Sequence, residues 1–180
     1  MNQSEWIVCE RRGRWAAALR VMLTRQDTAP REGQRLHEVR TLEEMAARLA
    51  ERPDSLALVE VDRANLSKVL RWLTDAARGH SGARFVALLD RTLQRPATSD
   101  RTPQKIDGQN IDGQDVVAAL FEAGVVEVAI SPRHLQHVRA LAEQHAATLA
   151  ARRPSATEGQ SIVEWAWSLL PWQSEESQVG

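Results

Sequence analysis

The chain has 180 residues, of which 43% are hydrophobic, and its 23 basic side chains nearly balance 24 acidic ones. This length suits one domain with a tail, and the net charge of −1 argues against a nucleic-acid or anionic-membrane partner, which would favour a basic surplus. The single cysteine excludes an internal disulfide framework, and no apolar run suits a signal peptide or a membrane span, so we expect a cytoplasmic protein.

Apolar residues alternate along the chain between short continuous runs, which favour strands, and stripes at helical spacing. Thr41 and Glu44 form a capping box that opens one helix, while Ser131 and Pro132 are expected to cap and open the last. In chain order, the pattern predicts a strand over 6–9, a helix over 14–25, a strand over 36–40, a helix closed by Pro53, a strand over 56–61, a helix stopped by Gly79, a strand over 84–89, a long polar loop over 91–114, a helix over 115–123, a strand over 125–130 and a helix that reaches Leu149.

Strand and helix alternate five times, which predicts a parallel sheet covered by helices on both faces. Right-handed crossovers leave few topologies, and the flavodoxin-like order 2-1-3-4-5 is the common five-stranded solution. We therefore expect a three-layer α/β/α fold over residues 1–150, with His145 in its core or at the edge of the core. Any site then lies at the carboxyl ends of the strands, where the sequence places Cys9, Glu10, Glu60, Asp62, Leu89, Asp90 and Ser131.

A family resemblance rests on three stretches: IVCE at 7–10, RPDSLALVEVD at 52–62 and ALFEAGVVEVAISP at 119–132. They resemble the first strand, the third strand and the fourth-to-fifth unit of CheY-like receiver domains, which belong to two-component response regulators. The resemblance spans residues 6–150 in order. It implies phosphoryl transfer to an aspartate after the third strand, assisted by an acidic pair that holds Mg²⁺, a hydroxyl side chain and a lysine.

The residues at those positions differ from the family pattern. A glutamate stands where the phosphoacceptor aspartate belongs, and a serine replaces the lysine that would neutralise phosphoryl charge. We therefore expect a degenerate receiver that is not an enzyme, needs no cofactor or metal and acts through protein–protein contacts as a signalling or scaffold module. By this resemblance, Cys9 and Glu10 stand at the acidic-pair positions and Glu60 at the acceptor position. Leu89 or Asp90 stands at the hydroxyl position, Val128 at the switch aromatic and Ser131 at the lysine.

Three alternatives accompany this interpretation. The first is a working phosphoreceiver with atypical residues, in which Asp62 becomes the acceptor if the strand register slips by two residues. The second is residual Mg²⁺ or Ca²⁺ binding by the converging carboxylates. The third, a flavodoxin-like enzyme, is disfavoured because no glycine-rich loop follows the first strand. Against cation binding stands the simpler expectation that Glu10, Glu60 and Asp90 pair with the adjacent Arg11, Arg63 and Arg91.

The last segment, residues 151–180, is an acidic, tryptophan-rich tail. Ser161 and Glu164 form a second capping box, which predicts a short helix over about 161–170. This helix is expected to dock on its own or a twin chain or, alternatively, to anchor a different protein. We also expect a homodimer, through a face that the resemblance assigns to Glu122, Arg133 and His137. The apolar residues of the tail that would make its contact are Ile162, Trp165, Trp167, Leu169, Leu170 and Trp172.

Overall fold

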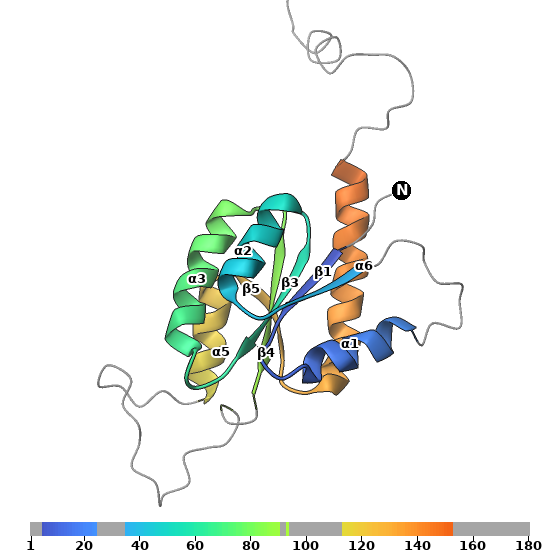
Figure 1. Ribbon diagram of the computed structural model, residues 1–180. Coiled ribbons are helices and arrows are strands. Elements are labelled where there is room, and N and C mark those ends of the chain that lie inside the picture. Colours follow the sequence, from blue (N-terminus) through green and yellow to red (C-terminus); the bar gives the residue numbers. More distant parts are fainter. Residues whose placement is uncertain (1–4, 25–34, 91–92, 94–112, 153–180) are drawn as a thin grey trace, which may run out of the picture. The chain divides into compact units, whose positions relative to one another are not determined.

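The computed structural model describes residues 5–24, 35–90, 93 and 113–152 (Figure 1). The chain divides into two units, Met1–Ala150 and Ala151–Gly180, and the elements described here belong to the first apart from the end of its last helix. In chain order these elements are β1 (Glu5–Cys9), α1 (Arg14–Thr24), β2 (Arg35–Val39), α2 (Leu42–Glu51), β3 (Leu56–Val61), α3 (Leu66–Gly79), β4 (Arg84–Leu89), α5 (Gly113–Glu122), β5 (Val125–Ala129), the 3-10 turn η1 (Pro132–His134) and α6 (Leu135–Arg152).

All five strands form one parallel sheet in the order β2-β1-β3-β4-β5, which confirms the predicted topology. Cys9 pairs with Val39 on one side and with Val59 on the other, and Val61 pairs with Leu89. The ends of β1, β2, β3 and β4 therefore lie along one edge of the sheet, which we call the carboxyl edge.

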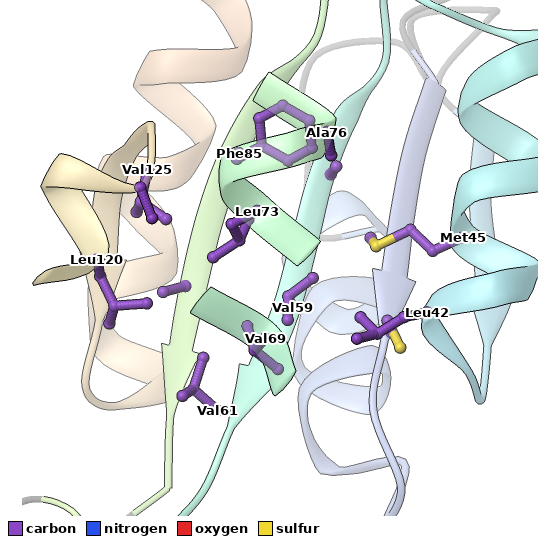
Figure 2. Close-up of a cluster of buried hydrophobic side chains, with 14 of the residues drawn as sticks. Leu42, Met45, Val59, Val61, Val69, Leu73, Ala76, Phe85, Leu120 and Val125 are labelled. Carbon is purple, nitrogen blue, oxygen red and sulfur yellow. The ribbon is translucent and has the colours of Figure 1, made fainter. Parts of the chain in front are cut away.

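Helices cover both faces of this sheet, with α2, α3 and α5 on one face and α1 and α6 on the other (Figure 1). In β1, Ile7 packs into the first of these layers, while Trp6 and Val8 pack into the second. Such alternation with burial on both faces explains why the strands are nearly continuous apolar runs. Figure 2 shows the first layer, in which side chains from α2, α3 and α5 meet those of β3 and β4, among them Leu42, Leu73, Leu120, Val59 and Phe85.

A local sequence signal accounts for the start of α2. The Thr41 hydroxyl accepts the Glu44 N–H at 3.1 Å, which confirms this half of the predicted capping box. The Glu44 carboxylate accepts the N–H of Arg40 at 2.7 Å, one residue before the N-cap, instead of the N–H of Thr41. The predicted helix after Ser131 instead begins with the 3-10 turn η1, and the Ser131 side chain makes no capping hydrogen bond. The α-helix itself starts only at Leu135.

A tight turn joins α5 to β5 at Gly124, whose φ of +97° favours glycine. A Cβ atom at this position would lie 2.6 Å from the Cβ atom of Ala77, so the close approach of α3 also requires glycine. In the part of the chain that the structure describes, no helix combines the length and apolar character needed to cross a membrane.

Candidate functional site

The carboxyl edge brings three buried carboxylates to neighbouring strand ends. Glu10 follows β1, Glu60 is the penultimate residue of β3, and Asp90 follows β4. Their exposed fractions are 2%, 7% and 9%, respectively. Burial of a carboxylate is costly unless hydrogen bonds compensate it, so the partners of these groups reveal how the site is used.

The Glu10 carboxylate serves as the N-terminal cap of α1. Its Oε2 atom accepts the N–H of Trp15 at 2.8 Å, and its Oε1 atom accepts the N–H of Ala16 at 2.5 Å. These amides belong to the first turn of the helix, where backbone N–H groups have no partner within the helix and the dipole favours negative charge. Arg40 makes a further hydrogen bond to this residue, because its guanidinium donates to the Glu10 carbonyl at 3.0 Å. Glu10 therefore fixes α1 and the adjacent loops.

The Glu60 carboxylate joins the β3 end to the loop after β1. Its Oε2 atom accepts the backbone N–H of Arg11 at 2.9 Å, across 49 positions of sequence. The Glu60 carbonyl accepts the Asn65 amide at 2.9 Å. The carboxylate and the carbonyl of this residue thus hold loops in place, at the position to which the resemblance assigns the acceptor aspartate.

Asp62 and Asn65 shape the turn between β3 and α3. The Asp62 carboxylate accepts the N–H groups of Ala64 and Asn65 at 2.9 and 2.8 Å, and the Asn65 side-chain oxygen accepts the Asp62 N–H at 2.8 Å. Asp62 also lies 3.9 Å from the Arg11 guanidinium. The spacing Asp-x-x-Asn before a helix is a turn signal that the sequence interpretation missed.

The expected arginine pairing is wrong for Glu10 and Glu60 and stays a prediction for Asp90. Glu10 and Glu60 accept backbone N–H groups rather than guanidinium groups. Among the described residues, Arg11 is the only arginine whose side chain pairs with Asp62. A buried carboxylate gains more from aligned amides of an adjacent loop than from a long side chain that must be ordered first. Arg63 is exposed, and Arg91 lies outside the described residues.

The positions to which the resemblance assigns the hydroxyl, switch aromatic and lysine groups hold neither a lysine nor an aromatic side chain. Leu89 is buried in the core, and Asp90 donates its backbone N–H to the Val61 carbonyl at 2.9 Å. Val128 is half-buried against the core beside β4. Ser131 is half-buried after β5, where its carbonyl accepts the His134 N–H at 3.0 Å.

Cys9 lies at the end of β1 and is 8% exposed. Burial and then the negative charges of Glu44, Glu60, Glu43 and Glu10 together raise the pKa of its thiol to about 11. A thiol with such a pKa stays protonated at neutral pH, whereas a nucleophile or metal ligand requires the thiolate. Cys9 is therefore an inert core residue.

Histidine and metal chemistry find little support in the described ranges. His145 is buried, as predicted, and its Nε2 atom lies 3.0 Å from the Asp54 carbonyl, which ties α6 to the segment before β3. His134 and His137 stack with ring centroids 6.0 Å apart on the surface. Within residues 5–24, 35–90, 93 and 113–152, no three His, Cys, Asp or Glu side chains converge as metal ligands. The tail residues from Ile162 to Trp172 lie outside these ranges.

Comparison with known proteins rests on solved structures, since no protein-family model and no curated protein matches this chain. A CheY-like protein, TadZ, from Pseudomonas aeruginosa PAO1 superposes with a TM-score of 0.51 at 14% identity, covering 78% of this chain and 99% of its own. A response regulator from Thermotoga maritima gives 0.49 at 15% identity, covering 79% and 99%, and a protein described as pilus assembly-related from Burkholderia pseudomallei gives 0.48 at 16%, covering 79% and 90%. Together with the strand order 2-1-3-4-5, the first of these likenesses shows that the chain has the CheY-like, flavodoxin-type fold of receiver domains.

Proposed function

We propose that this chain is a non-catalytic, receiver-like signalling or scaffold module that acts through protein–protein contacts. One observation carries the proposal: the carboxylates of Glu10 and Glu60, at positions that the resemblance assigns to the family's site, both accept backbone N–H groups of the β1–α1 segment. A carboxylate in that role stabilises loops and has fewer lone pairs left for Mg²⁺ or for attack on a phosphoryl group.

The side chains present also fit phosphoryl transfer poorly. That reaction depends on positioning and on neutralising charge, and a misplacement of ~1 Å costs ~100-fold in rate. Glu60 reaches about 1.5 Å further than an aspartate would, which is one C–C bond. Ser131 has no positive charge to offer a phosphoryl oxygen, and it follows β5 where the resemblance places a lysine.

Exposed apolar residues support a protein partner. Phe121 of α5, Val126 of β5 and Ile130 just after β5 are 49%, 41% and 39% exposed. They come from the α5–β5 region, which includes Glu122 and is followed by η1 and α6 with the exposed Arg133 and His137. We infer that this region forms the contact of a homodimer.

The alternative, a working phosphoreceiver, has Asp62 as its acceptor. Asp62 directly follows β3, and its side chain is 24% exposed, so it is more accessible to a phosphodonor than the buried Glu60. Its carboxylate already accepts two N–H groups of the following turn, which weakens this alternative.

Mass spectrometry of the intact chain distinguishes the non-catalytic module from the working phosphoreceiver. The chain is incubated with Mg²⁺ and acetyl phosphate, and we expect no added phosphoryl group of about 80 Da. The Glu60→Asp variant should remain unlabelled, because Ser131 still leaves the phosphoryl charge uncompensated. A stoichiometric adduct that disappears in Asp62→Asn would establish the phosphoreceiver instead, and one on Glu60 would equally overturn the proposal.

Sedimentation at micromolar concentration tests the contact surface. We expect a dimer of the 20.1 kDa chain and its dissociation by Phe121→Asp. Val21→Asp is the matched control, because Val21 is 48% exposed but lies on α1. A monomer across the whole range, or equal dissociation by both variants, would contradict the proposed face.

A further inference from the structure

The sheet ends at β5, a strand with a single charged side chain. Among the described strands, β5 pairs with β4 alone, so its outer edge is an edge of the sheet. The strand and the residue after it read VVEVAI, in which Glu127 carries the charge, and Val126 and Ile130 are 41% and 39% exposed. An apolar, β-branched segment at a sheet edge is a template for pairing with another chain.

The opposite edge strand, β2, is more polar. Arg35, His37 and Glu38 occupy three of its five positions, and the Glu38 carboxylate pairs with the guanidinium groups of Arg20 and Arg40. Charged side chains discourage the addition of a strand, because the new strand would remove them from water. At β5, by contrast, protection of the edge depends on Glu127.

Two local features already disturb the edge of β5. Val125 and Glu127 pair with the consecutive residues Phe85 and Val86 of β4, so Val126 is an extra residue that bends the strand. The Glu127 carboxylate accepts the N–H of Val128 at 3.2 Å. A further strand would have to displace this carboxylate before it could use the Val128 N–H.

We propose that Glu127 prevents β5 from pairing with β5 of a second copy of this chain. Glu127 is the middle residue of a five-residue strand. The antiparallel register that pairs every residue of two identical copies therefore places Glu127 opposite Glu127. Side chains directly opposite each other have Cβ atoms about 4.5–5.5 Å apart, where like charges are destabilising. A register that separates the two carboxylates pairs fewer residues of the strands.

This inference goes beyond the proposed function, because it concerns the backbone edge of β5 and not the apolar side chains of the proposed homodimer contact. The side-chain contact is reported by Phe121→Asp. The edge is reported by changes at Glu127, so the two proposals fail separately.

Sedimentation of a charge-swapped pair of chains tests the role of Glu127. Both chains carry Phe121→Asp, which removes the side-chain contact, and one of them also carries Glu127→Lys. Either chain alone brings like charges together. An equimolar mixture places a lysine opposite a glutamate, and we expect it to associate about five- to tenfold more tightly than either chain alone. Glu127→Thr removes the repulsion and should likewise strengthen self-association.

Asp75→Lys is the matched control, because it changes the net charge by the same amount but lies exposed on α3. Its mixture with the unswapped chain should show no gain. Thermal melts establish that each variant is folded, and hydrogen exchange should show the Val128 amide protected in the Glu127→Lys mixture. The proposal is overturned if that mixture associates no more tightly than its separate chains, or if the Asp75→Lys mixture gains as much.

Discussion

Replacement of Glu10 by glutamine tests whether this buried carboxylate stabilises the fold. Glutamine keeps the volume of the side chain, so packing changes contribute little. The amide oxygen can still accept one N–H, from Trp15 or Ala16, but the amide nitrogen then faces the other N–H. The variant also loses the negative charge at the start of α1, where the helix dipole favours it.

The expected cost follows from the hydrogen bonds. A bond to a charged group contributes about 1.5–3 kcal/mol, and leaving one buried amide unpaired costs about 1–3 kcal/mol. Since Trp15 and Ala16 are both 0% exposed, water cannot replace the missing acceptor. We therefore expect Glu10→Gln to lower the free energy of unfolding by about 2 kcal/mol and Glu10→Ala by about 3–4 kcal/mol, out of about 5–15 kcal/mol for a typical domain.

Urea unfolding of the full chain, followed by circular dichroism, measures both changes as a shift in midpoint at constant slope. Glu44→Ala is the control, because it removes one exposed capping contact and should cost only about 0.5–1 kcal/mol. A buried carboxylate without compensating partners would destabilise the fold, so its replacement by glutamine would raise the free energy of unfolding. If Glu10→Gln were neutral or stabilising, the structural role assigned to Glu10 would be refuted.

Three other predictions concern different parts of the chain. The pKa of Cys9 is raised from 9.0 to about 11, so the unfolded state loses its thiol proton first, and stability should fall by about 1.4 kcal/mol per pH unit between these values. Urea unfolding should show this extra loss in the parent chain and not in Cys9→Ala. Gly124→Ala should cost about 2–3 kcal/mol because of its positive φ and the contact with Ala77, while Gly79→Ala, with nothing within 4 Å, should be near neutral in the same thermal assay. Truncation after Arg153 should lower the melting temperature or dissociate the dimer; unchanged stability and mass would instead make the tail a free partner-binding motif.

The fold was predictable because its signals are local and repeated. Apart from β2, in which polar and apolar residues alternate, each described strand is a short, mostly apolar run. Each described helix has an apolar stripe or a cap that marks its place, as Thr41 does for α2. The error at Ser131 has a physical cause: serine followed by proline suits both an α-helix and a 3-10 turn, and packing of the following segment decides between them. His145 could be placed in the core by its stripe, but its partner, the Asp54 carbonyl, lies 91 positions away.

The candidate site was predictable only as a set of positions. Strand ends identify Glu10, Glu60 and Asp90 as neighbours, because parallel strands bring their carboxyl ends to one edge. What each carboxylate binds depends on register and loop geometry. The bond from Arg11 N–H to Glu60 spans 49 residues and exists only because β1 and β3 are adjacent in the sheet. The sequence suggested the Arg63 side chain as the partner of Glu60, whereas the sheet geometry brings the backbone N–H of Arg11 to it.

The bonds at the carboxyl edge bear on how such a module would transmit a signal. The Glu60 carboxylate holds the β1–α1 loop, its carbonyl holds Asn65, and Asn65 in turn holds Asp62. These contacts join the loops after β1 and β3 into one connected unit. A switch needs two arrangements with different affinities for a ligand, and a carboxylate that is already bonded in a closed network cannot change charge without breaking that network. The input is then expected to come from outside the site, through an occupant of the α5–β5 face. An amide hydrogen-exchange comparison of the chain at dilute and at micromolar concentration would locate it, and protection confined to α5 and β5 would identify that face as the receiving surface. Protection confined to the β1–α1 and β3–α3 loops would place the input at the site instead.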